Sequence, residues 1–230
     1  MTTVTEAVLR RRSTRAFLDR PVAESLVREI LDVARRAPSG GNMQPWRVWV
    51  VAGEEQKRLR AVAKARMMEN PAGDSAEYKI YPDNLWEPHR SWRYKCGEDM
   101  YALLGIPREN KFARLLRLAE NYDFFGAPVG LFFAIDRRMQ PGQWADLGMF
   151  IQTVMLLAEE RGLATCAQEA WSMLHKTVAE FVAMPPELML FCGMALGYAD
   201  NDAAVNRLVT DRAPFDEVFT LRGFPAVDRN

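Results

Sequence analysis

The sequence predicts an α+β fold, a sandwich in which helices flank a mixed central β-sheet. Amphipathic helical stretches and short β-branched or aromatic stretches both occur, but they alternate only partly, which favours this class over a doubly wound parallel sheet. The chain has 230 residues, of which 49% are hydrophobic, enough for one substantial core and short for two. A single domain over residues 1–230 is therefore expected.

The first part of the chain predicts three helices and one strand. Arginines in the last turn of the first helix complement the negative end of the helix dipole. Pro38 ends the second helix, and the turn residues of 39–42 follow it. The helices are expected over 3–12, 22–37 and 54–68, and the strand, which is β-branched and aromatic, over 46–52.

The middle of the chain, residues 67–125, is difficult to assign because tyrosine, tryptophan, proline and charged residues are scattered through it. One helix is expected at 108–122. The apolar residues are too dispersed to build a separate core, so the segment is interpreted as a variable excursion or lid of the same domain.

The second half of the chain predicts three strands and two helices. Gly162 is the expected C-cap glycine of the longer helix, and Ser172 is the expected N-cap of the other. The strands are expected over 128–135, 163–170 and 189–199, and the helices over 143–162 and 172–184. Residues 200–230 are too long for an ordinary loop, and we expect this C-terminal extension to wrap over another surface.

Composition and motif absences exclude several function classes. Thirty basic residues balance thirty acidic ones, so no global field favours nucleic acid or a membrane surface. Cys96, Cys166 and Cys192 form no CxxC pair, which fits a reduced setting, and no apolar run reaches about 18 residues. A soluble, cytoplasmic protein is expected. The two histidines are isolated, so no metal site is predicted, and neither a Walker A loop nor a GxGxxG motif is present.

Two local motifs remain after these exclusions. RRRSTRAF, residues 10–17, concentrates guanidinium groups and a serine hydroxyl, which suit phosphate oxygens. APSGGNMQPW, residues 37–46, displays backbone amides and carboxamides between a helix and a strand. Taken singly, the first is equally typical of a solvated helix end, and the second of a plain helix–strand connection.

Together, with one amphipathic helix between them, the two motifs resemble the opening of the FMN-dependent nitroreductase family. Two later segments match that family in the expected order: GLATCAQEAW at 162–171, which resembles the segment along the flavin ring, and NRLVTDRAPFDEV at 206–218, which resembles the segment that returns to the phosphate. The likeness is greatest to the subgroup that acts on nitrobenzoate and other nitroaromatics. It implies a three-layer sandwich and a domain-swapped homodimer, with residues 200–230 wrapping the partner subunit.

The resemblance also implies a set of residues that hold FMN. Arg11, Arg12 and Arg212 would hold the phosphate, with support from Ser13, and Arg15 would lie near the pyrimidine edge, where reduction deposits negative charge. The ring would be lined by Ala167, Gln168 and Glu169, and the partner subunit's flavin would be reached by Pro38, Ser39, Gly40 and Asn42. Some members have a lysine where Thr210 stands here, so phosphate binding would depend more on the arginines.

The implied activity is the reduction of nitroaromatic or quinone-like acceptors by NAD(P)H in a ping-pong hydride mechanism through flavin N5. No protein catalytic residue is then required, because the flavin carries the chemistry. A further basic contact from the middle of the chain has three candidates: Arg90, Arg93 and Lys95. An aromatic lid over the acceptor has five candidates: Trp86, Trp92, Tyr94, Phe124 and Phe125. Alternatives on the same scaffold are a dehalogenase, an enoate reductase, a flavin-fragmenting enzyme and a non-catalytic flavin-binding protein.

Overall fold

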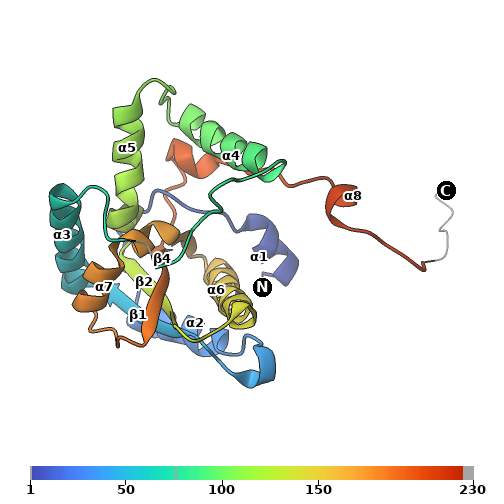
Figure 1. The fold of residues 1–230 in the computed structure, drawn as a ribbon, viewed down its shortest axis with the longest axis horizontal. Helices are drawn as coiled ribbons and strands as arrows, with labels where there is room; N and C mark the ends of the chain where they lie inside the picture. Colours follow the sequence, from blue (N-terminus) through green and yellow to red (C-terminus); the bar gives the residue numbers. More distant parts are fainter. Residues whose placement is uncertain (1, 76, 225–230) are drawn as a thin grey trace.

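The computed structural model describes residues 2–75 and 77–224 and is built around a four-stranded sheet (Figure 1). The strand order is β1-β2-β4-β3, with neighbouring strands antiparallel. The strands are β1 (Arg47–Ala52), β2 (Val129–Asp136), β3 (Ala164–Gln168) and β4 (Leu188–Gly197). The sheet expected to be mixed is thus antiparallel along its three ladders. Its parallel component, among the described residues, is one isolated bridge between Ser13 and Thr165.

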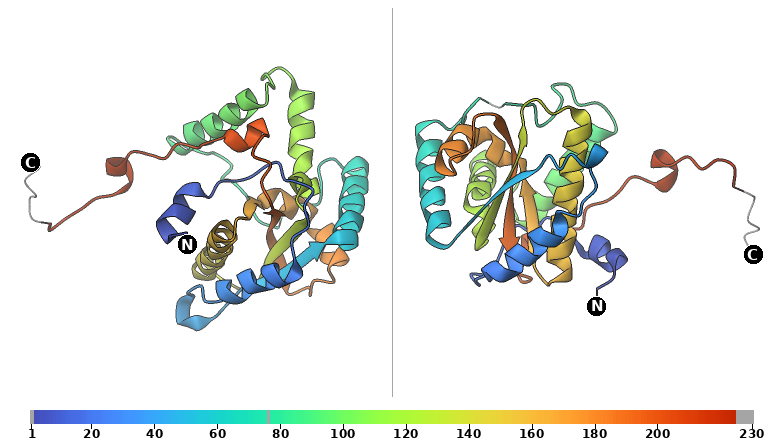
Figure 2. Two further views of the ribbon diagram at one scale, coloured as in Figure 1. Left: turned by 180° about the vertical axis from the view of Figure 1, so that it is seen from behind. Right: turned by 90° about the horizontal axis from the view of Figure 1, so that it is seen from below.

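Helices cover both faces of this sheet. The α-helices are α1 (Val4–Arg10), α2 (Glu24–Ala34), α3 (Gly53–Glu69), α4 (His89–Leu103), α5 (Lys111–Ala119), α6 (Pro141–Glu160), α7 (His175–Phe181) and α8 (Phe215–Val218). The 3-10 helices are η1 (Gly40–Asn42), η2 (Glu120–Gly126), η3 (Glu169–Leu174) and η4 (Ala204–Arg207). In Figure 2, α2 and α6 lie on one face of the sheet and α3 and α7 on the other.

The two hydrophobic clusters of the core follow the alternation of β2. Leu131 and Phe133 point to the side of α2 and α6, whereas Phe132 points to the side of α3 and α7. This is the two-residue period of a strand whose two faces are both buried. The α+β three-layer sandwich is therefore confirmed.

Two local expectations were wrong. The middle segment contains two α-helices, α4 and α5, where one was expected. The sequence of α4 has no clear apolar stripe, and none of its residues is buried in the structure. Ser172 does not cap α7. It lies within η3, where its hydroxyl donates to the Glu169 carbonyl at 2.8 Å, and α7 begins at His175 with Leu174 as its N-cap.

The middle segment is tied to the body of the molecule. The Asp74 carboxylate, which is buried, accepts a hydrogen bond from the Lys176 backbone N–H at 2.9 Å at the start of α7. The Tyr78 hydroxyl donates to the Phe191 carbonyl on β4 at 2.5 Å. These contacts join the middle segment to α7 and β4.

The C-terminal extension leaves the body after η4 and carries α8 out beside the molecule (Figures 1 and 2). It exposes large apolar side chains, among them Phe215, Phe219 and Leu221. Its expected wrapping is therefore not made on its own chain, and residues 225–230 of the predicted extension lie outside the described residues. Within the described part of the chain, no helix is both long and apolar enough to cross a membrane.

Candidate active site

The N-terminal basic motif is an extended segment placed between two strands of the sheet. The Thr14 N–H donates to the Thr165 carbonyl on β3 at 2.9 Å, and the Leu18 N–H donates to the Tyr198 carbonyl beyond β4 at 2.9 Å. Because side chains of extended backbone alternate between two sides, residues 11–18 present two faces with different chemistry.

Arg11, Ser13 and Arg15 share one face of the segment beside β3, where Ser13 bridges Thr165 and the Arg15 Nη1 donates to the Ser13 carbonyl at 3.3 Å. Burial raises the pKa of the nearby Cys166 thiol, and positive charges that include those of Arg15 and Arg11 act against that rise. The three predicted site residues are thus brought together beside the first residues of β3.

Arg12 lies on the opposite face of the segment. It lines a cleft of about 380 Å³ together with Arg10 and Arg20, between the segment and the end of α6. Its Nη1 donates to the Asn206 carbonyl at 3.0 Å. The structure therefore separates Arg12 from Arg11, although they are adjacent in sequence.

Asn206, at η4, joins the N-terminal segment to the C-terminal one. Its Oδ1 accepts from the Arg15 N–H at 2.8 Å, and its Nδ2 donates to the carbonyls of Ala16 and Asp200, each at 2.8 Å. The side chain is buried, so these bonds fix the backbone on which Arg15 stands. Sequence reasoning had placed Asn206 in a matching segment without giving it a role.

The end of β3 and the start of η3 carry the three residues predicted to line the ring. Ala167 is exposed, and Gln168 is buried. The Gln168 Nε2 donates to the Asn121 carbonyl at 2.8 Å, while its Oε1 has no partner. Burial raises the pKa of Glu169. This edge therefore carries a buried carboxamide oxygen without a partner and a carboxyl whose pKa is raised.

The predicted loop at Pro38, Ser39, Gly40 and Asn42 is exposed and sits at the other end of α6. The Gly40 N–H donates to Asp146 Oδ2 at 3.2 Å, and Asp146 is near the start of that helix. The cleft beside Arg12 is lined by Glu159, near its end. Thirteen residues of helix rise about 20 Å, so within one chain this loop does not reach the basic segment.

Arg212 lies on the C-terminal extension, away from the basic segment. Its guanidinium donates to Thr210 Oγ1 at 2.7 Å and to the Asp211 carbonyl at 2.8 Å. The extension touches α4 through a pair between Lys95 Nζ and Asp211 at 2.9 Å.

The other basic candidates from the middle of the chain have local partners. Arg90 pairs with Glu87 at 2.6 Å, and the Arg93 guanidinium lies 4.1 Å from the centre of the Tyr81 ring. Among the described residues, none of these contacts joins Arg90, Arg93 or Lys95 to the segment around Arg15.

The five aromatic lid candidates divide into two groups. Phe124 and Phe125 are core residues: Phe124 is fully buried and stacks on Trp171 with ring centres 4.7 Å apart. Assigning them to a lid was therefore wrong. Trp86, Trp92 and Tyr94 are exposed on the excursion and remain candidates.

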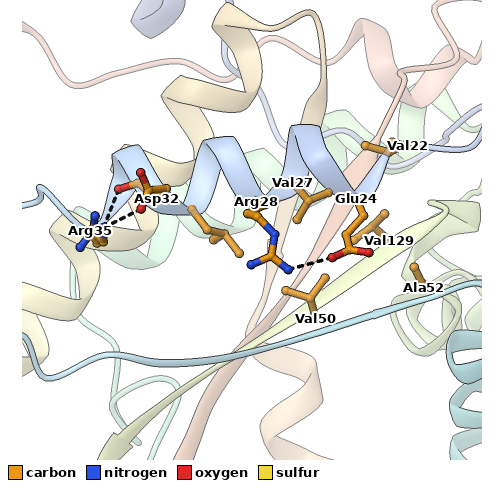
Figure 3. Close-up of a pocket in the computed structure, with 10 residues that line it drawn as sticks. Val22, Glu24, Val27, Arg28, Asp32, Arg35, Val50, Ala52 and Val129 are labelled. Atoms are coloured by element: carbon orange, nitrogen blue, oxygen red, sulfur yellow. Dashed lines mark hydrogen bonds and ion pairs between the residues drawn. The ribbon is translucent and has the colours of Figure 1, made fainter.

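Another cavity lies away from these residues. It has a volume of about 640 Å³ and lies between α2 and the edge strand β1 (Figure 3). Val27, Val50 and Val129 line it, with an ion pair between Arg28 and Glu24 at its rim. No predicted flavin residue lines it. In the part of the chain that the structure describes, no group of three or more potential metal ligands occurs either.

Comparison with known proteins identifies relatives along nearly the whole chain. Residues 8–198 match the Nitroreductase family. The chain is 40% identical to a 4-nitrobenzoate reductase of Pseudomonas putida over 222 residues, covering 96% of this chain and 95% of the relative. It is 38% identical to a nitrobenzene nitroreductase of Ectopseudomonas oleovorans, covering 92% and 93% of the two chains.

Solved structures agree with these relatives. The crystal structure of the FMN and NADPH-dependent nitroreductase NfnB from Sphigopyxis sp. strain HMH superposes with a TM-score of 0.94 at 46% identity, covering 96% of this chain and all of the other. The FMN-dependent nitroreductase NfnB from Mycobacterium smegmatis, solved in complex with NADPH, superposes with a TM-score of 0.90 at 28% identity, again over 96% of this chain and 100% of that one.

Proposed function

The chain belongs to the nitroreductase family, and from that premise we propose that it is an FMN-dependent oxidoreductase that uses NAD(P)H to reduce nitroaromatic or similar electron-poor acceptors. The observation that carries the proposal is the face of Arg11, Ser13 and Arg15 beside β3, which brings two guanidinium groups together, in a chain 40% identical to a 4-nitrobenzoate reductase.

The residues at this edge fit FMN chemically. A phosphate monoester carries between about 1.5 and 2 negative charges at neutral pH and calls for several cationic donors. Arg11 and Ser13 would supply donors from one face of the segment, and Arg212 from an extension. Arg12 would contribute least, because its guanidinium is engaged on the opposite face.

When bound, FMN supplies the redox chemistry by accepting hydride at N5 and passing it to the acceptor. The protein groups have supporting roles. Arg15 would place a fixed positive charge where the reduced ring gains negative charge, which favours reduction. Ala167, Gln168 and Glu169 would line the ring, with the Gln168 side chain held in place by the Asn121 carbonyl.

We further propose that the active unit is a homodimer. The exposed 38–42 loop, held about 20 Å along α6 from the basic segment, is suited to the flavin of the second subunit. The outstretched extension from residue 200 onward, with its exposed phenylalanines, is suited to wrapping that subunit and delivering Arg212. A cytoplasmic location remains our expectation, and the three free thiols are consistent with it.

The test is the visible spectrum of the purified protein, followed by anaerobic titration with NADPH and then with 4-nitrobenzoate. We expect a flavin spectrum that NADPH bleaches and the nitro compound restores. A bound flavin that stays oxidised under excess NADPH would contradict the oxidoreductase function and favour a non-catalytic flavin-binding protein. A colourless protein that takes up no FMN on dialysis would contradict the flavin site itself.

A further inference from the structure

A buried arginine from the middle of the chain lies directly behind the basic segment. Arg117, in the last turn of α5, has a side chain only 9% exposed. Its Nη2 donates to the Arg15 carbonyl at 2.9 Å, its Nη1 pairs with Glu120, and its guanidinium carbon lies 5.1 Å from the centre of the Phe125 ring. No sequence motif had pointed to it.

The stretch that begins at Arg117 contacts both segments predicted to hold the flavin. Arg117 bonds the backbone of Arg15. A few residues later, the Asn121 carbonyl accepts from Gln168 Nε2 at 2.8 Å, and the Tyr122 hydroxyl donates to the Ala170 carbonyl at 3.2 Å. The basic segment and the end of β3 are therefore braced by one short stretch of the middle region.

Arg117 also adds charge at this place. Burial lowers the pKa of Arg117, and the nearby positive charge of Arg15 acts in the same direction, opposed by Glu120. A guanidinium remains protonated throughout the working range of proteins, so the charge persists. Glu120 is 47% exposed, and water screens its charge more than that of Arg117. The buried Cys166 thiol lies within the field of both arginines.

We propose that Arg117 is a positioning residue of the flavin site, which holds the main chain of Arg15 and adds a second, buried positive charge that favours the reduced, anionic cofactor. The inference rests on the proposed function and extends it, because it assigns a role in tuning the reduction potential to a residue outside the matching motifs. A purely structural role would predict loss of stability without a change in the potential of retained flavin.

Arg60 provides a matched control for that distinction. It approaches the same turn from α3, where its Nη2 donates to the Ala127 carbonyl at 2.6 Å and its Nε lies 3.3 Å from Asp123. Like Arg117, it has a buried Nε without a hydrogen-bond partner. Its hydrogen bond goes to Ala127 and its ion pair to Asp123, and neither goes to Arg15 or Gln168. Arg60→Met therefore removes a comparable arginine without touching the site.

The experiment measures the midpoint potential of bound FMN by anaerobic dye equilibration, together with the thermal unfolding temperature, in the FMN-loaded protein. We expect Arg117→Met to lower the midpoint potential of bound FMN by about 30 mV. For a two-electron couple, this corresponds to an about tenfold lower ratio of reduced to oxidised flavin at a fixed potential. Arg60→Met should leave the potential unchanged. Glu120→Gln should shift it upward, because it removes the opposing charge. Arg117→Lys should keep most of the wild-type midpoint potential, because it retains the positive charge.

Equal potentials in Arg117→Met and Arg60→Met would overturn the inference, as would a downward shift in Glu120→Gln. If Arg117→Met does not fold, Glu120→Gln decides the question, because it removes the opposing charge and keeps a side chain of similar size in place. Failure of the proposed function would look different, since the wild-type protein would then bind no FMN or hold FMN that NADPH does not reduce.

Discussion

At the scale of single residues, two adjacent arginines differ in the face on which they stand. Arg11 shares the face beside β3 with Ser13 and Arg15, whereas Arg12 lines the cleft and donates to the Asn206 carbonyl. We predict that Arg11→Ala weakens FMN binding about tenfold or more, because a hydrogen bond to a charged group contributes roughly 1.5–3 kcal/mol. Arg12→Ala, the control, should weaken it much less. Equilibrium dialysis with FMN gives both dissociation constants, and equal losses would contradict the two-face arrangement.

Glu169 yields a prediction about pH. Burial raises its pKa in the folded protein above the ordinary 4.5, so the folded state holds this proton more tightly than the unfolded state. The contribution of Glu169 to the free energy of unfolding is therefore complete below about pH 4.5 and declines as pH rises through the folded pKa.

We predict that Glu169→Gln removes this decline and raises the unfolding temperature at about pH 8 by about 1–3 °C relative to wild type. The difference between the two proteins should shrink toward about pH 4.5, where both side chains are neutral. Calorimetry across this range provides the measurement. A wild-type protein that is more stable than the variant at high pH would mean that an unseen partner stabilises the carboxylate.

Single residues also show where sequence reasoning ended. Arg11, Ser13 and Arg15 could be predicted as site residues because the three motif positions fall close together in the chain. Asn206 and Arg117 reach the same place from far along the sequence, at separations of 191 and 102 residues from Arg15. A contact that only the tertiary fold creates leaves no local pattern, so neither role could be predicted.

At the scale of elements, the ring of Trp171 packs η3 against β4. Trp171 is fully buried and packs over Gly193, where an added Cβ would lie 2.9 Å from the ring Cγ and closer still to its edge. We predict that Gly193→Ala destabilises the protein by about 1–3 kcal/mol, because overpacking forces side chains or backbone to shift. Urea unfolding followed by tryptophan fluorescence measures the change. Gly142→Ala, where the added Cβ meets open space, is the matched control.

The elements that the sequence predicted well are those with a buried face. The strands appear within a few residues of their expected bounds, and β2 and β4 are buried along most of their length. In β1, Val51 is the buried position. Helix α4 was missed because no side of it is buried. Helix α7 starts three residues later than expected because residues 172–174 belong to η3.

At the scale of the whole molecule, the C-terminal extension exposes apolar side chains that its own chain does not cover. We predict that deleting residues 209–230 converts a dimer into a monomer and abolishes tight FMN binding, because both the exposed apolar residues and Arg212 are removed. Light scattering coupled to size exclusion measures the mass, and absorbance measures the flavin content. Arg212→Ala separates the two effects: it should lose flavin and stay dimeric. A monomeric wild-type protein would contradict the proposed assembly.

The whole-molecule prediction from sequence was right about the class and the layers and incomplete about the sheet. Apolar patterning specifies which stretches are buried, and hence the sandwich, but not the direction in which neighbouring strands run. The distance between the 38–42 loop and the basic segment could not be anticipated either, since it depends on the length and placement of α6.

The alternation of residues 11–18 has a consequence for how this protein tolerates change. Backbone hydrogen bonds at Thr14 and Leu18 hold this extended segment in place. The type of each residue and the number of residues between fixed points therefore affect the site in different ways. Replacing one residue alters one contact, whereas inserting or deleting one residue moves every later side chain to the opposite side. Such a change of length would direct Arg15 into the cleft and Thr14 toward the cofactor. Homologues that keep this chemistry are therefore expected to vary in composition here while conserving the count between the first arginine and the phenylalanine at 17.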